Sequence, residues 1–334
     1  MRVETVQCLK APVSGAKLEL QALEVSGDDV ISGRLIEAGT GAWYRIEEGI
    51  ADLLPAEYRN AERYEAFRRN HGFEPSPAPG SVGSAHKNTL TQVKFFSEHT
   101  EMYESEVVHS RFYEAFDEVT VGRWIARTIT PGTRVVEVGC GTGRQTLPLV
   151  RAGAKVVAVD LSENMLRLAR RKVRAERPEA RADFVAATAE NLPLRDEAFD
   201  AAVIFGSLHH FTDPRTALLQ IASAMKPGAH FYLMEPHKSP ARFIFDWMMR
   251  RWKLWTEEAS DDPLFTSTQF KSWLNAGGLE ARIRYGTYLP PHLFYRMSRG
   301  MAERLLATTD AAFGSLPGFR RLGGVIIAEA VKRP

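Results

Sequence analysis

A glycine-rich loop between a predicted strand and a predicted helix constrains this chain more than any other feature. The valine-rich run Thr133–Val138 leads directly into the segment Gly139–Gly143, which reads G-C-G-T-G. Glycines at such a turn let the backbone fold tightly and let a ligand approach it closely. The spacing G-x-G-x-G differs from the G-x-G-x-x-G of dinucleotide sites. Glu137 before the loop suits a cationic amino group, and Asp160 after the next strand suits two ribose hydroxyls.

The regular alternation of short apolar runs with helical segments predicts the fold class. Strands buried on both faces appear as nearly continuous apolar runs, and short strand–helix–strand units imply parallel strands. The predicted strands are Thr133–Val138, Lys155–Val159, Phe184–Ala187, Ala201–Phe205 and His230–Met234, and the predicted helices are Gln145–Ala152, Ser162–Arg174 and Arg215–Met225. We therefore expect an α/β fold with a doubly wound, Rossmann-like and mostly parallel sheet.

The first part of the chain has a different pattern, which predicts a small β-rich domain over residues 1–58. Its strand candidates are Leu18–Leu23, Gly33–Ile36 and Trp43–Ile46. A connecting helix and linker follow over residues 59–88, because the stretch from Glu74 to Ser84 is rich in proline, glycine and serine. The large domain then covers residues 89–334.

Composition excludes several classes of protein. The 334 residues have a formal charge of +2, which gives no strong signal for a nucleic-acid partner. Cys8 and Cys140 are the two cysteines, too few for a disulfide framework or a four-thiolate zinc site. No apolar run reaches the length of a membrane span, and the N-terminal residues lack the apolar core of a signal peptide. These features favour a cytoplasmic protein, and they give no indication of its oligomeric state.

Several further motifs occur in a fixed order after the glycine loop. Residues Asp160–Leu166 read D-L-S-E-N-M-L, and residues Ala187–Pro193 read A-T-A-E-N-L-P. Leu208–Phe211 (L-H-H-F) and Met225–Gly228 (M-K-P-G) follow. Together with the glycine loop, these motifs make residues 89–331 resemble a class I S-adenosylmethionine-dependent methyltransferase of the type 11 group.

The resemblance implies S-adenosylmethionine as cofactor and assigns residues to each part of it. Asp160 would accept hydrogen bonds from the ribose hydroxyls, and Thr188 stands where the family usually has aspartate. The sulfonium would lie near the end of the fourth strand of this domain. The expected cofactor-binding residues are Glu137, Gly139, Cys140, Gly141, Thr142 and Gly143 at the methionine end, Asp160 at the ribose, Leu161, Met165, Thr188, Ala189 and Glu190 around the adenine, and Phe205 and Gly206 near the sulfonium.

The N-terminal segment resembles a small zinc-ribbon family that accompanies some methyltransferases. The resemblance rests on the spacing of its turns and on the segment Gly49–Pro55, which reads G-I-A-D-L-L-P. Ala11, Ser14, Glu37 and Thr40 stand where that family has its four zinc cysteines. Alanine cannot ligate a metal, and hydroxyls are poor zinc ligands. We expect a degenerate ribbon that holds no metal.

The catalytic candidates follow the ends of the later strands. His210 and His237 are the favoured general bases, because imidazole titrates near neutral pH. His209 and Glu235 also follow strand ends, and Tyr103 could close over the cofactor. The alternative for each of these side chains is a purely structural role: a histidine that satisfies a loop carbonyl, or a tyrosine that packs in the core.

Two apolar insertions, at about residues 237–262 and 289–318, bear on the choice of acceptor. The stretch Ala241–Trp255 combines tryptophan, phenylalanine and methionine with basic residues. It could be a lid, line an apolar pocket or contact a membrane surface. The resemblance implies that such insertions enclose the acceptor. We therefore expect transfer to an oxygen or carbon of a small apolar molecule, such as a quinone, an isoprenoid lipid or a natural product.

Two other functions remain open on the sequence alone. A ribbon joined to a methyltransferase also occurs in some RNA-modifying enzymes, which makes RNA methylation the rival activity. The tetrapeptide N/D-P-P-[YF] of many nitrogen methylators is absent, since residues Phe205–Leu208 read F-G-S-L. The third hypothesis is a non-catalytic partner subunit that binds the cofactor.

Overall fold

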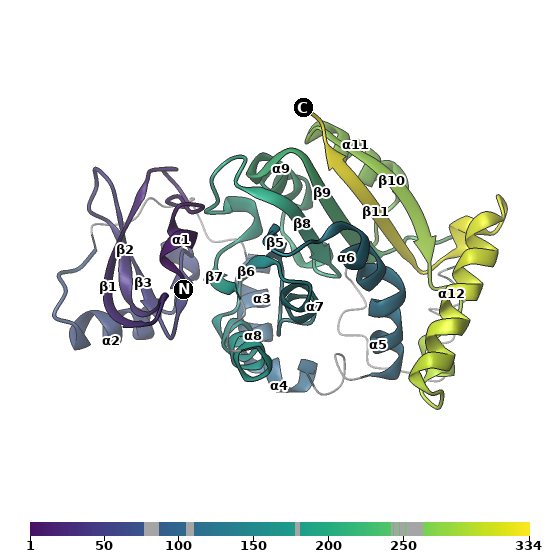
Figure 1. Cartoon of the computed structure of the whole chain (residues 1–334), viewed down its shortest axis with the longest axis horizontal. Helices are drawn as coiled ribbons and strands as arrows, with labels where there is room; N and C mark the ends of the chain where they lie inside the picture. Colours follow the sequence, from purple (N-terminus) through teal and green to yellow (C-terminus); the bar gives the residue numbers. More distant parts are fainter. Residues whose placement is uncertain are drawn as a thin grey trace.

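The computed structural model describes residues 1–76, 87–104, 110–177, 181–241, 243, 247, 251 and 263–334. Within these residues, eleven strands form one sheet in the order β1-β2-β3-β4-β7-β6-β5-β8-β9-β11-β10. The strands are β1 (Leu18–Ser26), β2 (Asp29–Glu37), β3 (Trp43–Glu47), β4 (Ile50–Asp52), β5 (Arg134–Val138), β6 (Lys155–Asp160), β7 (Ala182–Ala186), β8 (Phe199–Phe205), β9 (Met225–Pro236), β10 (Leu279–Gly286) and β11 (Val325–Lys332). Figure 1 shows β1–β3 at one end of the molecule and α12 at the other.

The centre of the sheet is parallel and both of its ends are antiparallel. Strands β4, β7, β6, β5, β8 and β9 run parallel to one another. Strands β11 and β10 pair antiparallel beyond β9, and β1–β3 pair antiparallel before β4. The doubly wound, mostly parallel arrangement predicted for the large domain is therefore observed.

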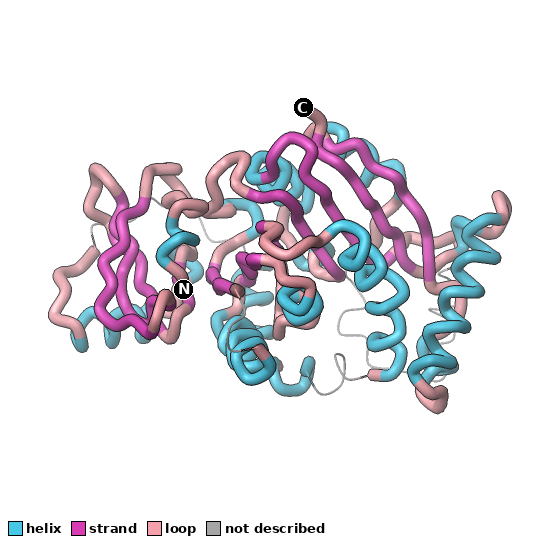
Figure 2. The backbone as a smooth tube through the Cα atoms, viewed as in Figure 1, coloured by secondary structure: helices cyan, strands magenta, loops and turns pink. Residues whose placement is uncertain are grey.

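Helices cover both faces of the sheet (Figure 2). The α-helices are α1 (Val3–Val6), α2 (Ala61–Asn70), α3 (Lys87–Glu98), α4 (Thr100–Tyr103), α5 (Arg111–Asp117), α6 (Arg123–Thr128), α7 (Thr146–Arg151), α8 (Glu163–Glu176), α9 (Pro214–Ala224), α11 (Ser267–Ala276) and α12 (Arg299–Ser315). Shorter helical turns are η1 (Ala56–Tyr58), η3 (Glu118–Gly122), η4 (Ala189–Asn191), η5 (Leu208–His210), η6 (Pro291–Phe294) and η7 (Arg320–Leu322). In this part of the chain, no helix combines the length and the apolar character that a bilayer crossing requires.

Each face of the sheet has its own hydrophobic core. Val136 and Val157 pack with α9 and α11 on one face, whereas Val135 and Val156 pack with α5–α8 on the other. This alternation follows from the two-residue period of a strand. Both cores need apolar side chains, which explains why the central strands are nearly continuous apolar runs in the sequence.

The N-terminal strands continue the large sheet, a feature that the expected separate ribbon did not include. Strand β4 pairs parallel with β7, and Leu53 N–H donates to Ala186 O over 2.9 Å. A second contact links residues 8–10 to residues 193–195, where Lys10 N–H donates to Pro193 O over 2.9 Å. The backbone pairing covers what would otherwise be an open sheet edge at β7.

Two of the positions that lack cysteine, Ser14 and Thr40, lie in turns that their own hydroxyls stabilise, and a third, Glu37, ends β2. Ser14 Oγ accepts from Ala16 N–H over 3.1 Å, and Thr40 Oγ1 accepts from Ala42 N–H over 3.2 Å. Glu37 is buried and accepts from the Tyr44 hydroxyl over 3.2 Å. Among the described residues, no group of three or more His, Cys, Asp or Glu side chains is arranged to hold a metal.

Candidate functional site

A cavity lies at the carboxyl ends of the central parallel strands. Strand β5 has β6 on one side and β8 on the other, so the winding of the sheet reverses at β5. Ligands of open α/β sheets bind at this reversal point. The cavity has an empty volume of about 1000 Å³ and is lined by the glycine loop and by the segments that follow β6, β7 and β8.

The glycine loop fits tightly between two neighbouring segments. Gly139 has φ +73°, and a Cβ placed there would lie 2.3 Å from Ser207 Oγ. Gly143 has φ +81°, and its Cβ would lie 3.0 Å from the Cβ of Ala169 in α8. Gly143 does not line the cavity, so its place in the motif follows from close packing of the loop against α8.

Asp160 joins the glycine loop to the start of α8. Its Oδ2 accepts from Gly141 N–H over 2.8 Å, and its Oδ1 accepts from Ser162 N–H over 2.9 Å. Burial raises the pKa of this carboxyl, and the backbone hydrogen bonds oppose that rise. Ser162 in turn caps α8, so the carboxylate is fixed at the cavity beside Leu161 and Met165.

Glu137 is a buried carboxyl in β5, two residues before the glycine loop begins. It accepts from the Thr146 hydroxyl over 2.6 Å, and burial raises its pKa to about 8. An ammonium group beside it would favour the ionised carboxylate and bring the pKa back down. The cavity therefore offers one acid suited to a cationic amino group and another suited to hydroxyl donors.

Three buried polar side chains at the cavity form no hydrogen bond within the part of the chain that the structure describes. They are the hydroxyls of Thr142 and Thr188 and the whole amide of Gln145. A buried polar group without a partner costs about 1–3 kcal/mol, so such groups point to a ligand that completes them. An adenosine joined to an amino acid carries suitable donors and acceptors, and the residues present therefore fit the expected cofactor.

The sequence motifs did not single out Gln145 as a binding residue. It is the N-cap residue of α7 and makes no capping hydrogen bond. Its position two residues after the glycine loop could have indicated a binding role, because a helix N-terminus at that place faces the ligand.

We predict that Gln145→Leu changes binding and stability in opposite directions. Affinity for S-adenosylhomocysteine should fall about tenfold, because the amide loses its ligand partner. The unliganded protein should gain about 1 kcal/mol of unfolding free energy, because an unsatisfied buried amide is removed. Calorimetric titration and urea unfolding measure the two effects. Gln220→Leu in α9, away from the cavity, is the matched control; equal affinities of both variants and wild type would contradict the assignment.

Helix α3 covers the cavity from the side opposite the sheet. Thr89, Gln92 and Phe96 line the cavity, and the Thr89 and Thr212 hydroxyls are 2.8 Å apart. Asn164 Nδ2 in α8 donates to Ser97 O over 3.0 Å. Nothing in the amino-acid sequence around Phe96 indicates that this helix reaches a loop more than a hundred residues away.

The segment after β8 forms an aromatic end of the cavity. Phe205, His210 and Phe211 line it, and the His210 ring meets the Phe96 ring edge to face with centroids 5.1 Å apart. Burial lowers the pKa of His210 to about 3, with a further contribution from His209. The imidazole of His210 is therefore neutral at physiological pH.

Glu235 supports the turn that carries both histidines. Its side chain is fully buried, and Oε1 accepts from Ser207 N–H over 2.9 Å and from Leu208 N–H over 2.7 Å. Its Oε2 lies 2.6 Å from His209 Nδ1. This geometry makes Glu235 a positioning residue behind η5, and it does not line the cavity.

Arg144 connects the cavity to α5. Its Nε donates to Asp117 Oδ2 over 2.6 Å, which neutralises the guanidinium charge. The guanidinium lies over the rings of Tyr113 and Phe205, at 4.5 and 5.1 Å from their centroids. These contacts hold the aromatic end of the cavity against α5.

Some predicted site residues lie outside the cavity, and one lines it with a carboxylate that is already hydrogen-bonded. His237 does not line it; its Nδ1 donates to Gly323 O over 2.8 Å and its ring lies on Tyr285. The proposal of His237 as a general base is therefore corrected: it joins β9 to the segment before β11. Glu190 lines the cavity, but its Oε1 accepts from Thr212 N–H and Asp213 N–H. Tyr103 ends α4, and its side chain lies outside the described part of the chain.

The two apolar insertions also differ from expectation. None of their described residues lines the cavity. Phe294 and Leu306 of the second insertion are buried, and the Phe294 ring packs on Phe112 in α5 with centroids 5.5 Å apart. Its apolar residues therefore fix α12 to the domain. In the first insertion Phe243 and Trp247 are exposed, and most of the stretch 241–255 lies outside the described residues.

Comparison with known proteins defines the class of protein to which this chain belongs. Residues 136–233 match the family described as "Methyltransferase domain". A demethylmenaquinone methyltransferase of Renibacterium salmoninarum is 32% identical over 150 residues, which cover 43% of this chain and 61% of that protein. A demethylmenaquinone methyltransferase of Symbiobacterium thermophilum is 30% identical over 189 residues, covering 53% of this chain and 71% of that protein.

Solved structures show the same fold. The crystal structure of the cyclase SpnF superposes with a TM-score of 0.53 and 20% identity, covering 75% of this chain and 98% of that one. The match with the first of the relatives spans about three-fifths of that protein's length. The chain belongs to the S-adenosylmethionine-dependent methyltransferase family.

Proposed function

We propose that the enzyme methylates an oxygen or carbon of a small, largely apolar acceptor of the quinol class. The observation that carries this proposal is the aromatic end of the cavity, which Phe96, Phe205 and Phe211 line together with one neutral imidazole, that of His210. A flat apolar ring with a hydroxyl fits such a surface. The names of the two demethylmenaquinone relatives support the same acceptor class.

The proposed mechanism divides the work among residues of the cavity. Bound S-adenosylmethionine supplies an electrophilic methyl group. Asp160 would accept hydrogen bonds from the ribose hydroxyls, and Glu137 would hold the amino group. Gln145, Thr142 and Thr188 would complete their hydrogen bonds on the remaining polar atoms of the donor. The enzyme's main contribution is then the alignment of the two reactants in a water-poor site.

His210 would orient the acceptor. Its neutral ring can accept a hydrogen bond from an acceptor hydroxyl, which directs the attacking atom. A histidine whose pKa is lowered to about 3 is a weak base, so it suits an acceptor whose proton is already acidic, as in a quinol or an enol. Glu235 and His209 would keep the His210 turn in place.

The test is a transfer assay with methyl-labelled S-adenosylmethionine and reduced short-chain naphthoquinols and benzoquinols. We expect label in the organic phase with wild type. His210→Phe should lower kcat about 100-fold, because hydroxyl orientation is lost, while affinity for S-adenosylhomocysteine stays within a few-fold. Cofactor binding with no transfer to any quinol or phenol would contradict the proposed acceptor class.

The lowered pKa of His210 also predicts a pH dependence of stability. Unfolding restores the ordinary pKa of 6.5, so the unfolded chain takes up a proton that the native chain does not bind. Native stability is thus complete above pH 6.5 and falls as pH decreases towards 3, by up to about 1.4 kcal/mol per pH unit from this group. Urea unfolding between pH 7.5 and 5 should show a smaller loss for His210→Phe than for wild type. Equal slopes would contradict a buried neutral His210.

For the N-terminal part, we propose that residues 1–58 are a ribbon domain that has lost its metal, joined through residues 59–88 to a methyltransferase domain over residues 89–334. The hydroxyl-held turns at Ser14 and Thr40 and the buried Glu37–Tyr44 contact support this proposal. Metal analysis of the purified protein should find no stoichiometric zinc. A full complement of zinc would overturn it.

A further inference from the structure

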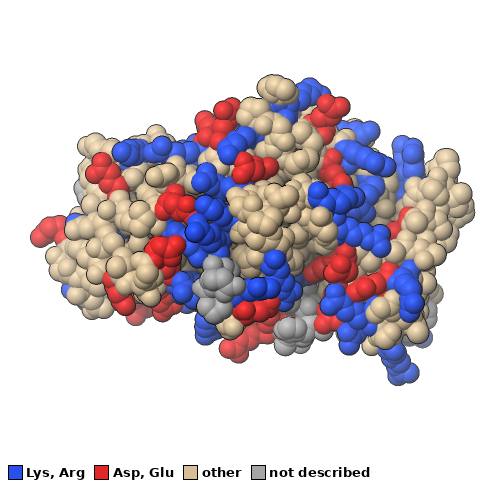
Figure 3. Space-filling view, in the orientation of Figure 1, with Lys and Arg blue, Asp and Glu red and all other residues tan. Residues whose placement is uncertain are grey.

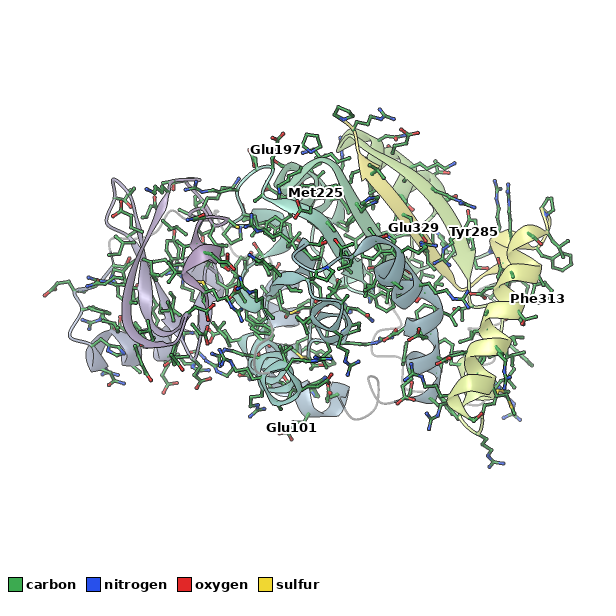
Figure 4. All side chains as sticks on the ribbon, in the orientation of Figure 1. Glu101, Glu197, Met225, Tyr285, Phe313 and Glu329 are labelled. Atoms are coloured by element: carbon green, nitrogen blue, oxygen red, sulfur yellow. The ribbon has the colours of Figure 1, made fainter. Side chains whose placement is uncertain are left out.

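A second large cleft lies away from the cofactor cavity. It has an empty volume of about 1710 Å³ and shares no lining residue with that cavity. Side chains of α6, α11, β10, α12, η7 and β11 border it. In Figure 4, Tyr285 and Glu329 on the sheet and Phe313 on α12 mark its surroundings. The proposed methyl transfer does not involve any residue of this cleft.

The cleft is strongly basic. Seven cationic side chains and two carboxylates, Asp310 and Glu329, line it. Its excess of positive over negative side chains is larger than the formal charge of +2 of the whole chain. The cations are Arg123, Arg127, Lys271, Arg282, Arg284, Arg320 and Arg321. Lys and Arg side chains gather on this side of the molecule between the sheet and α12 (Figure 3).

Few of these charges are neutralised within the protein. Glu329 pairs with Arg127 at 2.8 Å and with Arg284 at 3.3 Å. Asp310 accepts from Thr287 N–H over 2.9 Å, and burial raises its pKa to about 6. The other five cations form no ion pair with any residue that the structure describes. Like charges in one cleft repel one another, so binding of an external anion would stabilise it.

An exposed apolar turn adjoins the cleft. Residues 316–322, here called the apolar turn, follow α12 and include η7. They carry Leu316, Phe319 and Leu322, which are 46%, 51% and 37% exposed. Arg320 and Arg321 of the same turn line the cleft. The turn is held in place, because the Tyr288 hydroxyl donates to Arg320 O over 2.8 Å and the Phe313 and Phe319 rings pack together.

We propose that the basic cleft and the apolar turn together form a docking surface for an anionic lipid bilayer. Phosphate headgroups would occupy the cleft, and Leu316, Phe319 and Leu322 would enter the interface above the acyl chains. Basic residues attract anionic lipid. The exposed apolar side chains beside them would be buried in a bilayer interface, whereas a soluble phosphate or a nucleic acid would leave them in water. The inference goes beyond the proposed function and does not depend on the acceptor.

The test is sedimentation of the full chain with vesicles. Wild type should bind vesicles that contain phosphatidylglycerol and should not bind vesicles of phosphatidylcholine alone. The variant Arg320→Glu with Arg321→Glu should lose at least about tenfold in partitioning, because each basic residue near an anionic surface contributes about fivefold. Phe319→Ser with Leu322→Ser should also release the protein, although the charges of its cleft are intact.

The matched control reverses two exposed arginines far from the cleft, Arg69→Glu in α2 and Arg171→Glu in α8. It should bind vesicles as wild type does, and all variants should keep their affinity for S-adenosylhomocysteine, which reports correct folding. Wild type that fails to sediment, or a cleft variant that binds normally, overturns the proposal. Calorimetric binding of inorganic pyrophosphate or of RNA to the cleft, without vesicle binding, also overturns the bilayer as its occupant.

Discussion

Asp160→Ala is expected to weaken the binding of S-adenosylmethionine about 100- to 1000-fold. The carboxylate can accept two hydrogen bonds from the ribose hydroxyls, and hydrogen bonds to charged groups contribute about 1.5–3 kcal/mol each. The same substitution frees Gly141 N–H and Ser162 N–H, which Asp160 now holds. The glycine loop would lose its connection to α8 at the point where the donor binds.

The control for this variant is Asp200→Ala. Asp200 at the start of β8 also accepts from a backbone N–H, that of Arg134, over 2.9 Å, but it lies outside the cavity. It should change affinity for the methyl donor by less than about twofold, since it touches no ligand atom. Calorimetric titration with S-adenosylhomocysteine compares the two variants. Equal affinity of Asp160→Ala and wild type would remove the ribose-binding role.

Arg45→Met is expected to lower the free energy of unfolding by about 3–5 kcal/mol. Arg45 is 1% exposed, and its guanidinium contacts the buried Asp52 at 3.2 Å and Glu163 at the start of α8. Removing it leaves the buried carboxylate of Asp52 without its ion pair in the contact between the N-terminal strands and α8, whereas Glu163 keeps Arg167 at 3.0 Å. The melting temperature should fall by roughly 10 °C, judged by the usual conversion for chains of this size.

Two comparisons make this prediction specific. Arg151→Met removes an exposed ion pair with Glu176 and should cost less than about 1 kcal/mol. The triple variant Arg45→Met, Asp52→Leu, Glu163→Met should recover most of the lost stability, because no buried charge remains unpaired. Urea unfolding measures all three. An Arg45→Met variant as stable as wild type would show that the N-terminal strands are not held to α8 through this network.

The parts of the fold that local sequence determines were predictable. Each central strand is an apolar run, and the predicted strand Ala201–Phe205 lies within β8 (Phe199–Phe205). The glycine loop and Asp160 meet at the cavity as expected, because the carboxyl ends of β5 and β6 lie side by side. The chemistry of these motifs depends on residues close together in sequence or at the ends of neighbouring strands.

What the sequence did not predict depends on contacts between distant residues. The pairing of β4 with β7 joins residues more than a hundred positions apart, and nothing in the short segment Ile50–Asp52 identifies its partner. His237 looked equivalent to His210, since both follow strand ends, and only the tertiary structure shows that His237 turns to Gly323. The apolar character of residues 289–318 was interpreted as an enclosure for the acceptor, whereas in the structure Phe294 of this segment packs on Phe112 in α5.

The most direct test of the account uses methyl-labelled S-adenosylmethionine with the purified enzyme and an extract of host cells. The products are partitioned into organic, RNA and protein fractions, with Asp160→Ala as the inactive comparison. We expect label in the organic fraction that depends on Asp160 and is carried by a small aromatic or quinol-type molecule. Label confined to the RNA or protein fraction would contradict it.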